Sequence, residues 1–363
     1  MGRDKQRIEE ILNKEIDPVY KELSAKIGEK DSKVMPYVFE SLISLDQAKI
    51  LNEEPAPSEE IAEKFNLEKD TVENHIQYMF EIGLLFPGKS GWYLTRSWGA
   101  IHDSVGAANP KYDNNDFFDL AFAKHEESNQ KQIKEVENGT RKTVRQGMRV
   151  IPRWKSIKDL TGVLPYEDVR AILKQSDPIV QLNCACRKID RDRECEGVIP
   201  LATCLSLGRA GQYNLNRGAG KKITYEEAME LLDQLDTHPL VHMSGNSNRM
   251  PLLLCNCHEC CCGVFQRNVE TKKRFDQISM AKSRFVAGVA VENCDACGNC
   301  WDDICPSGAL QRKHYTEYGE ERVSIDPEIC IGCGLCVIRC PTEALRMKLV
   351  RPPEHIPAPG SEL

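Results

Sequence analysis

Apolar residues recur at helical spacing through the first 105 residues of the chain. Ile8, Leu12 and Ile16 stand four positions apart among Arg, Lys and Glu, and this pattern predicts a helical arm over residues 1–33. Residues 34–105 continue with apolar stripes of helical period and end in a short apolar segment punctuated by glycine. The pattern therefore predicts a second, mainly helical domain that ends in a hairpin.

The elements expected over residues 34–105 follow the order helix, turn, helix and hairpin. Pro55 and Pro57 interrupt the chain, and a later helix begins near Asp70; this order resembles a winged helix-turn-helix domain. Residues 58–95 carry seven acidic and three basic residues, a net charge of −4. Because DNA binding needs several cationic contacts with phosphate, we expect this domain to contact protein, and nucleic acid is not an expected partner.

The rest of the chain divides by composition. Helical periodicity predicts a helix over residues 225–235, and short apolar runs predict strands over 240–243 and 252–254. Together with the N-terminal helices, these elements indicate an α+β multidomain fold. The expected segments are a polar connector at 106–150, a cysteine-rich middle domain at 151–285, a second cysteine-rich domain at 286–350 and a flexible proline-rich tail at 351–363.

Charge and cysteine usage restrict the classes of function. The 363-residue chain has a net charge of −7 and 7% aromatic residues, which argues against bulk binding to nucleic acid or anionic membranes. No apolar run reaches the roughly 18 residues that a membrane span requires, so a cytoplasmic protein is expected. All 17 cysteines lie at or after Cys184. In a reducing cytosol, cysteines at this density are expected to be metal ligands or redox groups.

Two cysteine runs near the C-terminus repeat one pattern. Each contains three cysteines with two residues between neighbours, followed by a Cys-Pro step; four residues separate Cys300 from Cys305, and three separate Cys336 from Cys340. The runs resemble the bacterial two-cluster [4Fe–4S] ferredoxin. Three thiolates in one tight loop hold three corners of a cubane, and in that family the fourth ligand comes from the other run.

The resemblance to the two-cluster ferredoxins implies two [4Fe–4S] clusters with eight cysteine ligands. Paired Cys-x₂-Cys units also make zinc sites, but zinc does not call for a third cysteine at the same interval or for Cys-Pro in both copies. The implied ligand sets are Cys294, Cys297, Cys300 and Cys340 for one cluster and Cys330, Cys333, Cys336 and Cys305 for the other.

The remaining nine cysteines form a middle block with less specific spacing. Core packing does not explain them, because five fall within residues 255–262 and adjacent side chains point in different directions. An additional iron–sulfur cluster is favoured, and a structural zinc site is the main alternative. A reactive thiol or persulfide site is a third possibility. The candidate metal ligands are Cys186, Cys195, Cys204, Cys255, Cys257, Cys260 and Cys261.

The order of the blocks resembles a group of ferredoxin-like proteins from anaerobes. This resemblance implies an iron–sulfur protein that passes single low-potential electrons to a redox partner or a larger oxidoreductase complex. Two alternatives stay open: an oxidoreductase whose middle domain binds substrate at an iron–sulfur site, and a redox-responsive regulator acting through the winged helix. No nucleotide fingerprint or nucleophile motif identifies catalytic residues or a substrate, so whether the chain is an enzyme is left open.

Overall fold

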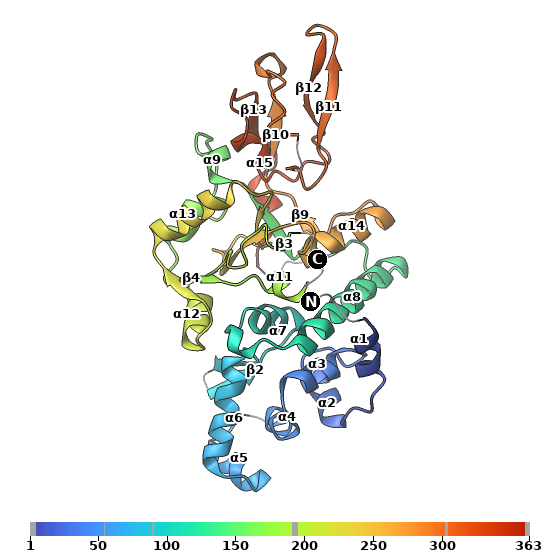
Figure 1. The fold of residues 1–363 in the computed structure, drawn as a ribbon, viewed down its shortest axis with the longest axis vertical. Helices are drawn as coiled ribbons and strands as arrows, with labels where there is room; N and C mark the ends of the chain where they lie inside the picture. The colour runs from blue at the N-terminus through green and yellow to red at the C-terminus, as the bar shows by residue number, and fades with distance from the viewer. Residues whose placement is uncertain (1–4, 54, 89–90, 191–194, 302–303, 360–363) are drawn as a thin grey trace. The chain divides into compact units, whose positions relative to one another are not determined.

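The computed structural model describes residues 5–53, 55–88, 91–190, 195–301 and 304–359 (Figure 1). The chain forms two compact units. The first unit comprises residues 1–135, 182–196 and 213–221; the second comprises residues 136–181, 197–212 and 222–363. Within the described parts of the chain, no helix is long and apolar enough to cross a bilayer.

These units differ from the continuous segments expected from composition. Residues 182–196 and 213–221 group with the N-terminal unit, although they were expected in the middle domain. The rest of the middle segment and the two C-terminal cysteine runs form one unit. The reason is packing: residues of the middle sheet and of the cysteine runs belong to the same buried apolar cluster.

The first unit is mainly helical, with one hairpin in which Leu85 pairs with Leu94. Its core is built from apolar faces of nearly all its helices, with Leu23, Val38, Ile50 and Leu120 fully buried. Its elements are α1 (Lys5–Leu12), α2 (Pro18–Lys26), α3 (Met35–Leu42), α4 (Leu45–Asn52), α5 (Ser58–Phe65), α6 (Lys69–Glu81), β1 (Leu85–Gly88), β2 (Gly91–Leu94), α7 (Trp98–Gly106), η1 (Pro110–Tyr112), most of α8 (Asn115–Glu137) and α11 (Ala185–Ile189).

Small residues bring the distant segment α11 onto α7 within the first unit. A Cβ atom added at Gly106 would lie 2.6 Å from the Ala185 side chain, so the two helices approach more closely than larger residues permit. This contact joins positions about 80 residues apart in the sequence. It explains why residues 182–196 belong to the N-terminal unit.

The second unit is organised around a seven-stranded sheet. The strand order is β6-β4-β5-β8-β7-β3-β9; the central pairs β5–β8, β8–β7 and β7–β3 are antiparallel, and β9 runs parallel to β3. Its elements are β3 (Met148–Ile151), α9 (Trp154–Ile157), α10 (Val169–Lys174), β4 (Ile179–Leu182), β5 (Cys204–Leu207), β6 (Lys221–Ile223), α13 (Tyr225–Leu235), β7 (Val241–Gly245), β8 (Leu253–Cys257), α14 (Gly263–Phe275) and β9 (Met280–Ala281), with α12 (Arg209–Asn216) beginning in this unit.

The side chains on the two faces of the sheet belong to different apolar clusters, because successive residues of a strand point to opposite faces. Ile151 and Leu254 face a cluster that includes apolar residues of α10 and α13. Val150 and Met243 face the other cluster, which includes Phe265 of α14 and residues of both C-terminal cysteine runs. The sheet therefore forms a wall against which the cysteine runs pack.

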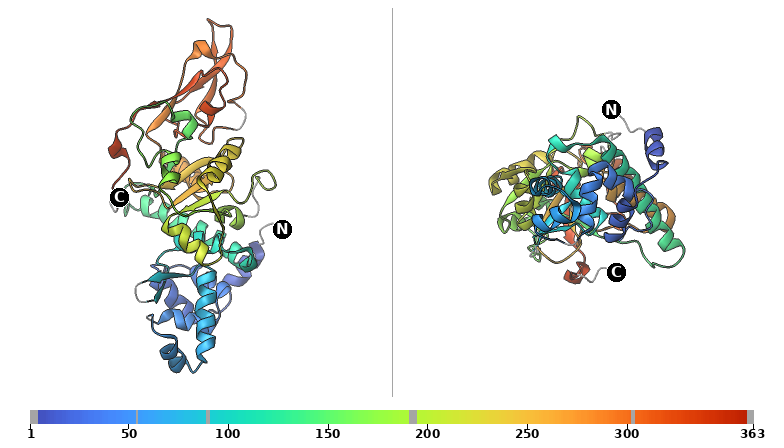
Figure 2. Two further views of the ribbon diagram at one scale, coloured as in Figure 1. Left: turned by 90° about the vertical axis from the view of Figure 1, so that its left-hand side faces the viewer. Right: turned by 90° about the horizontal axis from the view of Figure 1, so that it is seen from below.

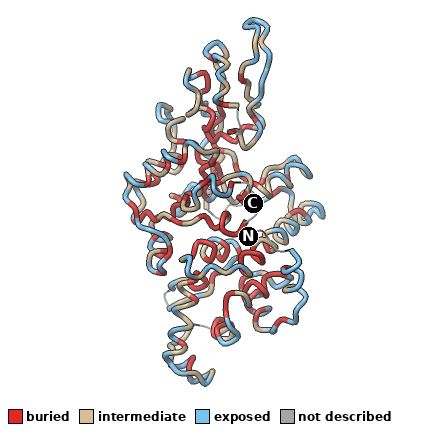
Figure 3. Tube along the Cα trace, viewed as in Figure 1, coloured by how far each residue is buried: buried red, intermediate tan, exposed pale blue. Residues whose placement is uncertain are grey.

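The C-terminal cysteine segment, residues 286–350, is formed mainly by loops and two antiparallel strand pairs. Phe285 pairs with Leu349 in the first strand pair, and Leu310 pairs with Ile325 in the second. The β11–β12 hairpin, drawn in orange to red in Figure 2, is largely exposed along β11 (Figure 3). The elements are β10 (Phe285–Val289), η2 (Val291–Asn293), β11 (Leu310–Tyr315), β12 (Glu320–Ile325), α15 (Leu335–Ile338), β13 (Leu345–Leu349) and η3 (Pro353–His355).

Candidate metal centres

The first C-terminal cysteine run and the last cysteine of the second run surround one cavity, which we call cavity I. Trp301 and Val323 form part of its wall. Cys297 is exposed, whereas Cys294 and Cys300 are buried. The four cysteines that line cavity I are Cys294, Cys297, Cys300 and Cys340.

The other four cysteines surround a second space, which we call cavity II. Its wall is apolar, with Ile304, Ile331 and Leu335 buried around it. The cysteines that line cavity II are Cys305, Cys330, Cys333 and Cys336. Each cavity thus receives three cysteines from one run and one from the other, which is the division that the ferredoxin resemblance implies.

Two glycines permit the tight loop around cavity II. Gly332 and Gly334 have φ angles of +71° and +78°, a region that L-residues with side chains rarely adopt. A Cβ atom at Gly332 would collide with the Phe285 carbonyl oxygen, and one at Gly334 would collide with the Ser156 hydroxyl. The loop therefore lies directly against β10 and the beginning of α9.

Comparison with known proteins identifies the C-terminal segment. Residues 293–344 match the 4Fe–4S dicluster domain family. The chain is 38% identical over 66 residues to an uncharacterised ferredoxin of Methanocaldococcus jannaschii, a match that covers 17% of this chain and 75% of that protein. The chain belongs to the ferredoxin family. Its ferredoxin domain, which carries both cysteine runs, is C-terminal.

Other relatives of the ferredoxin domain are electron carriers or enzyme subunits by name. The electron transport protein HydN of Escherichia coli is 29% identical over 101 residues, which cover 26% of this chain and 53% of HydN. Pyruvate synthase subunit PorD of Methanothermobacter marburgensis is 33% identical over 57 residues, which cover 16% of this chain and 58% of PorD. The chain thus spans little more than half the length of these two relatives. No solved structure gives a significant match to the chain.

Two buried thiols of the ferredoxin domain, Cys300 and Cys333, have raised pKa values because they lie in the interior beside other cysteines. Burial, with the neighbouring Cys340 and Cys294, raises the pKa of Cys300 to about 11. Burial raises the pKa of Cys333 to about 12, and Cys305 adds to this effect. Four thiolates gathered in one cavity repel each other, so ligation there requires a cationic metal centre and releases protons.

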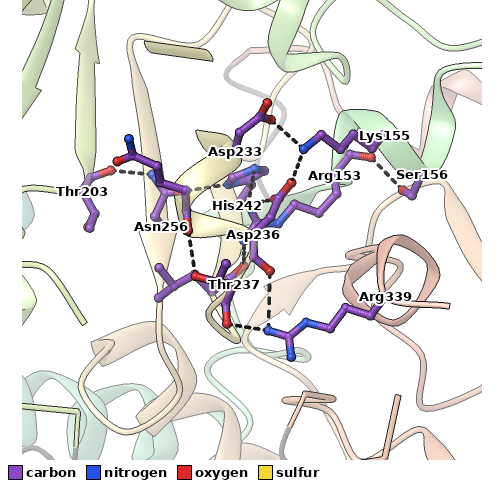
Figure 4. Close-up of polar contacts among 12 residues, drawn as sticks. Arg153, Lys155, Ser156, Thr203, Asp233, Asp236, Thr237, His242, Asn256 and Arg339 are labelled. Atoms are coloured by element: carbon purple, nitrogen blue, oxygen red, sulfur yellow. Dashed lines mark hydrogen bonds and ion pairs between the residues drawn. The ribbon is translucent and has the colours of Figure 1, made fainter. Parts of the chain in front are cut away.

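A buried polar network connects cavity II with the sheet (Figure 4). The backbone N–H of Arg153 donates to the Cys333 carbonyl at 2.9 Å. The Arg153 guanidinium forms an ion pair with Asp236 at 2.7 Å and lies 3.0 Å from Nε2 of His242. Arg153 and His242 are almost completely buried, so this network is part of the protein interior.

The direction of each hydrogen bond in this network follows from the chemistry of its side chains. Because a guanidinium only donates, Nε2 of His242 accepts from Arg153, and Nδ1 therefore carries the proton and donates to Oδ1 of Asn256. The Asn256 amide then donates to the Thr203 carbonyl. Burial, with the charge of Arg153, lowers the pKa of His242 well below its usual value, so the imidazole is neutral. The network reaches from a ferredoxin loop to Asn256, which lies between Cys255 and Cys257.

The structure distributes the sequence-predicted middle-block ligands over both units. Cys186 lies on α11 in the first unit, where its sulfur is 3.9 Å from Nε2 of His102, and Cys195 belongs to the same unit. The other candidates belong to the second unit: Cys204 on β5, Cys255 and Cys257 on β8, and Cys260 and Cys261 in the turn that precedes α14.

One cysteine outside the predicted set joins this arrangement. Cys255 and Cys262 both lie close enough to Cys257 to raise the pKa of its thiol, together with its burial. Cys262 is the N-cap of α14 and is not among the ligands that the sequence pattern predicts. The signal that finds it is structural: β8 continues through Cys257, so Cys255 and Cys257 share one face of the strand and the following turn brings Cys262 beside them.

Proposed function

We propose that this protein transfers single electrons at low potential through two [4Fe–4S] clusters in its ferredoxin domain. Cavity I would hold one cluster through Cys294, Cys297, Cys300 and Cys340, and cavity II would hold the other through Cys305, Cys330, Cys333 and Cys336. The observation that carries this proposal is the lining of each cavity by four cysteines contributed three-and-one by the two runs. Clusters of this type accept and release one electron each.

The two clusters have different surroundings, which supports different roles for them in electron transfer. Cys297 of cavity I is exposed, so the cluster there would exchange electrons with an external redox protein. Cavity II lies against the sheet, and Cys333 and Cys336 are buried. Burial is the main cause that raises the pKa of Cys336, and Cys300 of the other set adds to it, so the two sets of cysteines lie near each other.

The likeness to HydN and to a pyruvate synthase subunit supports a role beside a larger oxidoreductase. The residues outside the ferredoxin domain would then fix a partner or add a further redox centre. We propose that a third iron–sulfur cluster has its ligands among the middle-block cysteines, because five of them fall within residues 255–262, where core packing does not explain them.

A reductive titration of the anaerobically purified protein, followed by electron paramagnetic resonance, tests the electron-transfer proposal. We expect two one-electron centres in the ferredoxin domain, with a spectrum broadened by interaction between two nearby reduced clusters, and one further centre if the third cluster is present. Two reducible clusters without a third centre would reject only the third cluster. If the iron-loaded protein gave no reducible signal at all, the electron-transfer proposal would be rejected.

The proposal that each cluster takes its fourth ligand from the other cysteine run has its own test. Cys340→Ser should change the spectrum of the cluster held by the first run, and Cys305→Ser should change that of the second. The Cys297→Ser and Cys333→Ser variants show which spectrum belongs to which cluster, because each removes a ligand that the cluster receives from its own run. If Cys340→Ser instead altered the same signal as Cys333→Ser, the three-and-one ligand assignment would be wrong.

A further inference from the structure

Ser283 fastens the loop around cavity II to the segment that precedes β10. The Ser283 backbone N–H donates to the Ile331 carbonyl at 3.0 Å, and its hydroxyl donates to the Gly332 carbonyl at 2.8 Å. Ile331 and Gly332 lie between Cys330 and Cys333, two of the cysteines that line cavity II. Ser283 and Ile331 are 3% and 4% exposed, so this contact is shielded from water.

Arg351 places a positive charge next to Ser283. Its Nη1 atom donates to the Ser283 carbonyl at 2.6 Å and lies 3.4 Å from the Phe285 carbonyl oxygen. The same Phe285 oxygen is the nearest atom that a Cβ at Gly332 would meet. The guanidinium and the cavity II loop therefore contact the same backbone group.

The position of Arg351 is fixed by its backbone as well as by its side chain. Its N–H donates to the Arg284 carbonyl at 3.1 Å, and its carbonyl accepts from Nε of Arg284 at 3.1 Å. In the described part of the chain, both hydrogen bonds of the Arg351 guanidinium go to carbonyl oxygens, and no carboxylate lies within ion-pair distance of it. Its charge is therefore not cancelled by a direct partner.

The other charged groups around Arg351 leave positive charge in excess beside the loop. Lys282 adds a second cation, whose ammonium donates to the Glu328 carbonyl. The charge of Arg284 is offset by a buried ion pair. The Glu328 carboxylate, which interacts with Lys282 and Arg351, belongs to an exposed residue, so solvent screens it. Burial lowers the pKa of His355, which leaves its imidazole neutral at pH 7.5.

We propose that Arg351 raises the reduction potential of the cluster held in cavity II. The inference rests on the proposed electron-transfer function, and it assigns a role to a residue outside residues 293–344, which match the dicluster family. Reduction adds negative charge to a cluster, so a fixed positive charge nearby favours the reduced form. Burial of Cys333 and Cys336 acts in the opposite direction, because it disfavours added negative charge. Arg351 offsets this effect of burial.

A potentiometric titration of the full-length, anaerobically purified protein, followed by electron paramagnetic resonance, tests the role of Arg351. Arg351→Gln keeps a hydrogen-bond donor but removes the charge. It should lower the midpoint potential of the signal that Cys333→Ser alters, by about tenfold in the ratio of reduced to oxidised cluster, or about 59 mV. The signal that Cys297→Ser alters should not move. Arg351→Lys keeps the charge and should keep both potentials near those of the original protein.

Controls separate the effect of charge from an effect on structure. Lys348→Gln removes an exposed cation of β13 and should leave both potentials unchanged. Three results would overturn the inference and leave the electron-transfer function intact: equal shifts in Arg351→Gln and Arg351→Lys, an unshifted cavity II signal in Arg351→Gln, or loss of about four irons from that variant. An original protein without reducible clusters would reject the inference and the function together.

Discussion

His242 offers a direct test of the buried network between the sheet and cavity II. Its Nδ1 donates to Asn256 and its Nε2 accepts from Arg153 at 3.0 Å. In His242→Leu the Asn256 carbonyl oxygen loses this donor in the protein interior, while Arg153 keeps its ion pair with Asp236. A buried polar atom left without its partner costs about 1–3 kcal/mol. We therefore expect His242→Leu to lower the free energy of unfolding by about 2 kcal/mol at pH 7.5.

His242 should also make the free energy of unfolding depend on pH, and the sign of this dependence follows from its pKa. The pKa of His242 in the folded protein lies well below that of a histidine in an unfolded chain, which is about 6.5. Below pH 6.5 the unfolded chain binds a proton at this position that the folded protein does not, so acid favours unfolding. From pH 7.5 to 5.5 this lowers the free energy of unfolding by about 1.4 kcal/mol. His242→Leu lacks this contribution, so its deficit should shrink toward acid pH.

Anaerobic guanidinium unfolding measures this deficit, with circular dichroism reporting the fold and visible absorbance reporting the clusters. The exposed His314 on β11 supplies the control, and His314→Leu should remain within about 0.5 kcal/mol of the original protein at both pH values. A deficit for His242→Leu that is the same at pH 7.5 and 5.5 would refute the assignment of a neutral, buried imidazole. A deficit near zero at pH 7.5 would refute the network itself.

Two further changes test other contacts of the second unit. Glu167 and Arg284 form an ion pair at 2.7 Å with side chains 1% and 3% exposed, so Glu167→Gln should lower the free energy of unfolding by about 3 kcal/mol. The control is Glu343→Gln, at the exposed ion pair with Arg346, which should change the free energy of unfolding little. Equal losses in the two variants would contradict this reasoning. Gly332→Ala should destabilise the loop around cavity II by about 2 kcal/mol or more, seen as faster loss of one cluster's spectrum. Gly319→Ala also places a side chain at positive φ but in open space, and comparable cluster loss in both variants would show that the Gly332 clash is unimportant.

The ferredoxin domain is the part of this chain that sequence predicts best. Its eight cysteines recur at fixed intervals, and local loop geometry then decides which corners of a cluster each run reaches. The helix predicted over 225–235 is confirmed as α13, with Thr224 and Glu227 forming a capping box at its start. These features depend on residues close together in the sequence. The resemblance of residues 34–105 to a winged helix remains a prediction.

The middle block shows why other features escaped prediction. The apolar run 252–254 predicted a strand, but β8 extends to Cys257. Cysteine and asparagine give little hydropathy signal, so the common face of Cys255 and Cys257 was not visible in the sequence, and neither was their proximity to Cys262. The grouping of residues 182–196 with the first unit likewise depends on the long-range contact between Gly106 and Ala185. Contacts between distant segments carry no local pattern that sequence reasoning can use.

Mössbauer spectroscopy of ⁵⁷Fe-labelled, anaerobically purified protein, combined with iron and sulfide counts, tests the central claim most directly. Two cubanes in cavities I and II predict at least about eight irons and eight sulfides per chain, all in [4Fe–4S] clusters that take up one electron each on reduction. A protein whose iron is mononuclear, or whose ferredoxin cysteines hold only zinc, would contradict the account.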